Sequence, residues 1–117
     1  MLVTRFEELD IWKQAREIVS DIYIDFKEMN DFTFKNQITR AGISIMNNIA
    51  EGFSRESKKE FHYFLNIAKG STGEVKNMYY IAEDQQYISN TLAEERRARC
   101  DKQKNMIAKF MKYLKQP

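Results

Sequence analysis

Proline is absent from the interior of this chain: the only proline among its 117 residues is the last one, Pro117. Proline removes a backbone hydrogen-bond donor and clashes with the preceding helical turn, so no proline interrupts a helix here. The chain has only four glycines and lacks the closely spaced turn signals of a β protein. The sequence therefore predicts an all-α fold, and its length fits one domain over residues 1–117.

Four helices are predicted from the apolar periodicity and from the turn signals between them. They cover about residues 4–29, 34–53, 58–86 and 91–115. In the first helix, apolar side chains recur at alternating spacings of three and four, the pattern of a helix packed in a bundle. This core-facing seam consists of Trp12, Ala15, Val19, Ile22, Phe26 and Met29.

The first two helices carry more apolar side chains than one seam requires. In the first helix, Ile11 and Ile18 lie off the seam, with Tyr23 nearby. The second helix has a second apolar stripe, formed by Ile43, Met46, Ala50 and Phe53. Since one stripe is sufficient for a helix in a four-helix monomer, we expect this surplus to pack against a further surface.

The second helix carries polar groups on the side that should face the core. Its seam consists of Ile38, Ala41, Ile45, Asn48 and Gly52. Asn48 lies within this seam, and Ser44 and Glu51 lie beside it. A buried amide costs several kcal/mol unless it is paired, so we expect a partner for Asn48 on another helix. If the Asn48 amide is paired in the interior, we expect Asn48→Ala to destabilise folding or assembly by about 1–3 kcal/mol.

Polar residues of the second and third helices are candidates for one interhelical polar cluster. The candidates are Gln37, Arg40, Ser44, Asn48, Glu51, Ser71 and Glu74. If Glu74 meets Arg40, the pair is an interhelical salt bridge whose role is structural specificity. The alternative is ligand binding, with a small-molecule site around Asn48, Glu51 and Glu74.

Small residues occupy the middle of the predicted third helix, from Gly70 to Gly73. Each of these two glycines costs about 1 kcal/mol relative to alanine in a helix interior. We expect a close crossing with another helix to compensate for this cost. A hinge or a gap for a ligand is the alternative.

The net charge of +2 conceals an asymmetry between the two ends of the chain. Residues 1–32 contain four basic and eight acidic side chains, whereas residues 91–117 contain eight basic and three acidic ones. The two end helices could attract each other as neighbours, or the basic one could present a surface to phosphate groups. The candidates for phosphate contacts are Arg96, Arg97, Arg99, Lys102, Lys104, Lys58 and Lys59.

Residues that carry catalytic or metal chemistry are sparse. His62 is the only histidine, and no second imidazole or suitably spaced cysteine accompanies it as a zinc ligand. The Glu-x-x-His motif of a di-iron bundle does not occur. Cys100 lies on the seam of the last helix, which favours a buried structural thiol over a nucleophile. The sequence thus predicts no enzyme, no catalytic residue, no metal and no cofactor.

The sequence also indicates where the protein resides. The N-terminal residues lack the basic and apolar stretches of a signal peptide. No apolar run approaches the roughly 18 residues of a membrane-spanning helix. A single cysteine forms no internal disulfide, which suits a reducing compartment. We therefore expect a cytoplasmic protein without a membrane partner.

Four motifs together resemble one known family. They are Phe6-x-x-Leu9-x-x-Trp12, Gln37-x-x-Arg40-Ala41-x-x-Ser44-Ile45-x-x-Asn48-Ile49-Ala50-Glu51-Gly52, Arg55-x-x-Lys58-Lys59-Glu60-Phe61-x-x-Phe64-Leu65 and Ala68-x-Gly70-Ser71-x-x-Glu74. The pattern is similar to that of the 23S rRNA intervening-sequence proteins over residues 6–90, and the accessory protein of diversity-generating retroelements is a related branch. The last helix resembles the family only in length and general character.

The resemblance implies an up-down antiparallel four-helix bundle that assembles into a homo-oligomeric ring, typically a pentamer. The related accessory protein binds nucleic acid and a reverse transcriptase, so by analogy the basic helix is a candidate RNA surface. Our first hypothesis is a non-enzymatic oligomer that binds RNA or a ribonucleoprotein through clustered Arg and Lys, with RNA or an RNA-processing protein as its partner. The alternative is a protein-interaction scaffold, for example for a polymerase, without direct nucleic-acid binding.

Overall fold

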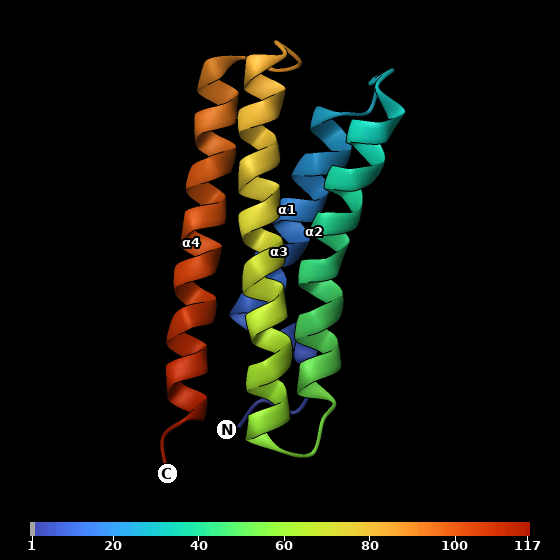
Figure 1. Ribbon diagram of the computed structural model, residues 1–117. Helices are drawn as coiled ribbons and strands as arrows, with labels where there is room; N and C mark the ends of the chain where they lie inside the picture. Colours follow the sequence, from blue (N-terminus) through green and yellow to red (C-terminus); the bar gives the residue numbers. More distant parts are fainter. Residues whose placement is uncertain (1) are drawn as a thin grey trace.

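The computed structural model describes residues 2–117 and contains a short 3-10 helix followed by four α-helices. These elements are η1 (Phe6–Glu8), α1 (Asp10–Asp25), α2 (Phe32–Phe53), α3 (Lys58–Asp84) and α4 (Asn90–Leu114). Consecutive helices run in opposite directions, and both chain ends lie at the same end of the bundle (Figure 1). The predicted all-α, up-down antiparallel four-helix bundle is confirmed.

The bundle is elongated, with principal extents of 47, 21 and 20 Å. Its longest helix, α3, packs against both α2 and α4, and α1 packs against the same two helices from the other side (Figure 1). One apolar cluster runs along the axis between the four helices. Its fully buried side chains include Ile22, Ile45, Leu65 and Ile107, one from each helix.

Side chains cap the first turns of α2, α3 and α4. Asp31 accepts a hydrogen bond from the backbone N–H of Phe34 at 3.1 Å. Ser57 and Ser89 accept equivalent bonds at the starts of α3 and α4. These bonds satisfy backbone donors that have no partner inside their helix. The three capped helices begin and end within two residues of the predicted bounds.

The first helix is shorter than the predicted 4–29. Leu9 adopts an extended conformation that separates η1 from α1, and Phe26 ends α1 as its C-cap. Phe6 and Met29 nevertheless pack against the core from outside the helix. The apolar spacing therefore overestimated the length of this helix, because side chains in the flanking turns continue its apolar face.

The core face of α1 differs from the predicted seam. Ile11 and Ile18, which were predicted to be surplus, are 3% and 2% exposed and lie in the core. Trp12 and Val19, which were predicted to lie on the seam, are only half-buried. The prediction that Ile11 and Ile18 are surplus to the core is thus wrong. Two neighbouring rows of apolar residues on α1 both fit spacings of three and four, so the spacing did not identify the core-facing row. Tyr23 is exposed.

On α2, Ile49 rather than Asn48 points into the core. Ile49 is fully buried, whereas Asn48 is half-buried at the edge of the bundle. The residues of the predicted second stripe are half-buried in the single chain, namely Ile43, Met46, Ala50 and Phe53. A further packed surface on α2 therefore stays a prediction.

Close helix contacts occur at Gly42 and Gly52 rather than at Gly70 and Gly73. A Cβ atom at Gly42 would lie 2.6 Å from Cδ1 of Ile22, and the space at Gly52 is similarly restricted. At Gly70 and Gly73, a Cβ atom would meet no atom of residues 2–117 within 4 Å. The close crossing predicted at the middle of α3 is therefore wrong for the single chain, because the space beside both glycines is open.

Candidate functional site

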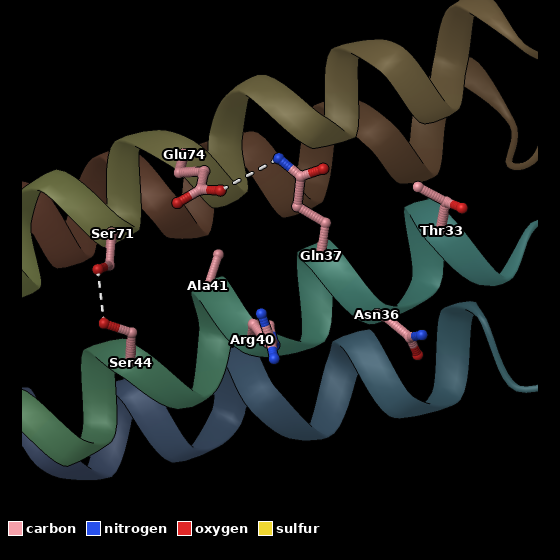
Figure 2. A pocket seen from close by; sticks show the side chains of 8 residues that line it. All are labelled: Thr33, Asn36, Gln37, Arg40, Ala41, Ser44, Ser71 and Glu74. Atoms are coloured by element: carbon pink, nitrogen blue, oxygen red, sulfur yellow. Dashed lines mark hydrogen bonds between the residues drawn. The ribbon is translucent and has the colours of Figure 1, made fainter.

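A polar groove of about 790 Å³ lies between α2 and α3. Six of its lining residues come from α2 and two from α3: Thr33, Asn36, Gln37, Arg40, Ala41, Ser44, Ser71 and Glu74 (Figure 2). Five of these residues belong to the predicted interhelical polar cluster. The structure therefore brings most of that cluster together at one surface.

Two hydrogen bonds join the walls of this groove. Ser44 Oγ and Ser71 Oγ lie 2.8 Å apart, and one hydroxyl donates to the other. Closer to the start of α2, Gln37 Nε2 donates to Glu74 Oε2 over 3.5 Å, which is a long contact (Figure 2). These bonds link α2 to α3 and leave the amide and the carboxylate with spare hydrogen-bonding capacity.

Arg40 and Glu74 carry opposite charges that are not paired with each other. Among residues 2–117, neither side chain takes part in an ion pair. The prediction of a salt bridge between Arg40 and Glu74 is therefore wrong for the single chain. The α2 residue that reaches Glu74 is Gln37, which lies one turn before Arg40. The groove therefore presents a guanidinium and a carboxylate that form no ion pair within residues 2–117.

Asn48 and Glu51, the other two residues of the predicted cluster, lie away from this groove. Asn48 Nδ2 donates to the carbonyl oxygen and to Oγ of Ser44, at 2.8 and 3.0 Å. The prediction of a partner on another helix is therefore wrong, because the amide nitrogen of Asn48 donates to Ser44, one turn earlier in the same helix. Glu51 pairs with Arg55, and Asn48 and Glu51 line a second groove of about 620 Å³ beside Phe6.

Arg96 is held by two aspartates of α1. Its Nε and Nη2 donate to the two carboxylate oxygens of Asp25 at 2.7 and 2.8 Å, and Nη1 lies 3.4 Å from Asp21. The Asp25 side chain is 2% exposed and also accepts a hydrogen bond from the Tyr79 hydroxyl at 2.8 Å. The hydrogen bond to Asp25 raises the pKa of Arg96, and burial raises the pKa of Asp21.

Arg97 and Arg99 are also paired within the bundle. Arg97 Nη1 lies 3.2 Å from Oε1 of Glu83, and its guanidinium lies 4.0 Å from the ring centroid of Tyr80. Arg99 Nη1 lies 3.0 Å from Asp21. The acidic α1 and the basic α4 therefore attract each other as neighbours. Phosphate binding by these arginines stays a prediction.

Lysines supply the free positive charge at one end of the bundle. Lys58 and Lys59 lie at the start of α3, and Lys115 lies just after the end of α4. Together with His62 and Leu114 they line a pocket of about 260 Å³, at the end where both chain termini lie (Figure 1). In the part of the chain that the structure describes, none of these three lysines forms an ion pair.

Lys102 and Lys104, the remaining candidates for phosphate contacts, lie near the middle of α4. Lys102 is exposed and Lys104 is half-buried, and neither forms an ion pair with any described residue. They do not line the pocket of Lys58 and Lys59. The residues predicted to contact phosphate are thus distributed along the bundle and do not form one cluster.

Cys100 is a buried structural thiol, as predicted. It is 1% exposed, and burial raises the pKa of its thiol to about 12, so thiolate is scarce at neutral pH. His62 is half-buried. Over residues 2–117, no three His, Cys, Asp or Glu side chains lie close enough to hold a metal ion, and no helix has the length and apolar character to cross a membrane.

Two buried polar contacts between helices were not predicted. Gln103 is fully buried on α4, where its Nε2 donates to the carbonyl oxygen of Ile11 on α1 at 2.8 Å. Its position on the seam of the last helix was the available signal, since a glutamine facing the core needs a partner. The bond between Tyr79, which is 1% exposed, and Asp25 had no such signal, because helical spacing does not show which residues of α1 and α3 meet.

Known proteins share this fold and sequence pattern. A crystal structure of a protein of unknown function from the S23 ribosomal protein family of Bacteroides thetaiotaomicron matches 87% of this chain and 95% of its own, with a TM-score of 0.80 and 23% sequence identity. A comparison with curated proteins finds no match. Residues 7–109 match the family described as 23S rRNA-intervening sequence protein. This chain therefore belongs to the family of 23S rRNA-intervening sequence proteins.

Proposed function

We propose that this protein is a non-enzymatic, homo-oligomeric helical bundle that binds RNA or a ribonucleoprotein through exposed lysines, in the cytoplasm. Family membership supports RNA as the partner, because the family name refers to an intervening sequence of 23S rRNA. The observation that carries the proposal is the group of Lys58, Lys59 and Lys115 around one pocket. Within residues 2–117, none of the three has an acidic partner.

Free lysines suit a phosphate backbone better than paired arginines do. To contact phosphate, Arg96 would have to release Asp25, whose side chain is only 2% exposed. Leaving such a carboxylate without its partner costs about 3–5 kcal/mol. Lys58 and Lys59 are exposed on flexible stems, so they can reach phosphate without loosening the bundle. The lysine pocket is therefore the first surface to test.

Assembly into a homo-oligomer would multiply these contacts. The family resemblance implies a ring, typically a pentamer, in which every subunit brings its own lysine pocket. Weak sites that are presented together gain affinity, because each bound site raises the effective concentration of the next. We expect this protein to bind long RNA more tightly than short oligonucleotides.

The test is a charge reversal at the lysine pocket. Lys58→Glu with Lys59→Glu should weaken binding of a labelled single-stranded RNA at least about tenfold at low salt. The variant should also reduce the dependence of affinity on salt, because fewer phosphate contacts release fewer counterions. Fluorescence anisotropy over a series of salt concentrations measures both quantities.

The matched control reverses Lys27 and Lys35, which lie at the opposite end of the bundle from the pocket (Figure 1). It changes the net charge by the same amount and should leave RNA affinity close to that of the wild type. Equal affinity of the two double variants would contradict a role for the lysine pocket. Absence of RNA binding by the wild-type protein would overturn the RNA proposal itself.

A protein-interaction scaffold is the second candidate function. It is favoured by apolar side chains that remain exposed on α3, where Tyr63, Ile67 and Ile81 are 62%, 37% and 40% exposed. Exposed apolar side chains that gather in a patch mark protein–protein interaction sites, among other contacts. A scaffold would retain one defined protein, such as a polymerase, in a pull-down and would show no salt-dependent RNA binding.

A further inference from the structure

Tyr63 is an exposed aromatic residue in the second turn of α3. It is 62% exposed, and its ring contacts that of Phe64, with the ring centroids 5.2 Å apart and the planes at 84° to each other. The Arg55 guanidinium lies 4.9 Å from the centroid of the Phe64 ring. Edge-to-face contacts favour a defined orientation of both rings. Tyr63 therefore presents an oriented aromatic surface to its surroundings.

Lys59 lies beside the Tyr63 ring on the surface of α3. Residues three and four apart are neighbours on a helix, so Tyr63 lies between Lys59 on one side and Glu60 on the other. Lys59 also lines the lysine pocket, and no described residue forms an ion pair with it. The Glu60 carboxylate repels phosphate. A phosphate backbone is therefore favoured on the Lys59 side of the ring, within reach of the pocket.

We propose that Tyr63 stacks on an unpaired base, so that this ring and the lysine pocket together bind single-stranded RNA. The inference rests on the RNA binding of the proposed function and names the form of RNA that the same site takes. Grooves that bind single strands combine cations for the backbone with aromatic rings for the bases. Every base has a flat aromatic face, so this contact tolerates any sequence.

Double-stranded RNA is a poorer occupant of this surface. Its bases are stacked on one another inside the helix, and its major groove is too deep and narrow for side chains to read. A ring exposed on the side of a helix would meet only the outside of such a duplex, where it gains no stacking. A protein partner is also less well matched, because contact with the ring alone leaves the positive charge of the lysine pocket without a complement.

Replacement of the Tyr63 ring tests the stacking directly. Tyr63→Leu should weaken binding of a labelled single-stranded RNA at least about fivefold, and Tyr63→Phe, which keeps a ring, should stay within about twofold of the wild type. The dependence of affinity on salt should be the same in Tyr63→Leu as in the wild type, because no phosphate contact is lost. A blunt RNA duplex of the same length should bind Tyr63→Leu and the wild type equally. Fluorescence anisotropy measures all of these affinities.

The matched control is Tyr23→Leu. Tyr23 is also an exposed tyrosine, at 55%, but it lies on the acidic α1, whose C-terminal half is at the far end of the bundle from the lysine pocket (Figure 1). This variant should bind single-stranded RNA as the wild type does. Both tyrosines are exposed, so circular dichroism should show an unchanged fold in each variant. Equal losses of affinity in Tyr23→Leu and Tyr63→Leu would contradict a specific role for Tyr63.

The outcomes separate this inference from the proposed function. A wild-type protein that binds no RNA would overturn both. RNA binding that is lost in Lys58→Glu with Lys59→Glu but unchanged in Tyr63→Leu would overturn the stacking and leave the lysine pocket standing. Equal losses for the single strand and the duplex in Tyr63→Leu would refute the preference for unpaired bases. A lower oligomer mass of Tyr63→Leu in light scattering would place the ring in a contact between copies and refute the inference.

Discussion

Arg96 on α4 donates two parallel hydrogen bonds to the carboxylate of Asp25 on α1, at 2.7 and 2.8 Å. The two residues are 71 positions apart in the chain. Bidentate pairs of this kind fix orientation as well as distance, so this contact sets how the first helix lies against the last. The Tyr79 hydroxyl, which donates to the same carboxylate, connects α3 to the pair.

Removal of Arg96 is expected to destabilise the fold strongly. Arg96→Ala leaves the Asp25 carboxylate buried without its cation, and such losses cost about 3–5 kcal/mol. Urea denaturation followed by circular dichroism measures the change in the free energy of unfolding. Lys102→Ala, on the exposed side of the same helix, should stay within about 0.5 kcal/mol of the wild type. Similar effects of the two substitutions would contradict a stabilising pair.

Alanine is expected to act in opposite directions at two glycines. Gly42→Ala should destabilise the fold by about 1–3 kcal/mol, because its Cβ would lie 2.6 Å from Cδ1 of Ile22. Gly73→Ala should stabilise it by about 0.5–1 kcal/mol, because its Cβ meets no described atom within 4 Å and alanine favours the helix. Thermal unfolding of the two variants beside the wild type measures both shifts. A loss of stability in Gly73→Ala would show that something packs against that position.

Alkaline pH is expected to lower the free energy of unfolding. Burial raises the pKa of the Cys100 thiol from 9.0 to about 12, so the unfolded chain releases this proton first. The native state then binds more protons than the unfolded state, and stability falls as pH rises through the window from about 9 to 12. Burial also raises the pKa of Tyr79 above its ordinary value of 10.0, which adds to the loss above pH 10.

Denaturation at a series of pH values from about 8 to 10 measures this loss. Cys100→Ala removes the thiol and should flatten the decline between about pH 9 and pH 10, where Tyr79 contributes little. An identical slope in wild type and variant would contradict the assignment to Cys100. In the native protein, a thiol reagent should react only at the rate at which the chain opens, because Cys100 is 1% exposed.

Loss of the Asn48 amide is expected to have a modest effect. Asn48→Ala should lower the free energy of unfolding by about 1 kcal/mol, at the low end of the range predicted from the sequence. The reason is that its amide bonds only to Ser44 in the same helix and is half-buried. Chemical denaturation measures this change. A loss above about 3 kcal/mol would indicate that Asn48 has a partner beyond the single chain.

The number of helices follows from the sequence because apolar periodicity and capping residues are local signals. Asp31, Ser57 and Ser89 cap their helices, and each helix begins within two residues of its predicted start. The start of α1 was missed because Leu9 is an apolar residue in an extended conformation, and its side chain fills the core just as a helical residue would. Spacings of three and four also fit two adjacent rows, which is why Ile11 was assigned to the wrong face.

The candidate site could be predicted in composition but not in pairing. Gln37, Arg40, Ser44, Ser71 and Glu74 gather at one groove because each lies on the side of its helix that faces the other. Which of them meet depends on how far α2 is shifted along α3, and helical periodicity does not encode this shift. Glu74 therefore contacts Gln37 rather than Arg40. The same limitation applies to Arg96. Its positive charge was compatible with a phosphate contact and with attraction to the acidic first helix, and the sequence did not identify Asp25 as its partner.

Both chain termini lie at the same end of the bundle as the lysine pocket, which has a practical consequence for how the protein is prepared (Figure 1). Lys115 lines that pocket, two residues before the end of the chain, and the N-terminus lies at the same end of the bundle (Figure 1). A histidine tag or fusion partner on either terminus would therefore crowd the pocket and add charge to it. Tags should be cleaved before any binding assay, and a fluorescent label is better attached at the far end, in the turn between α3 and α4.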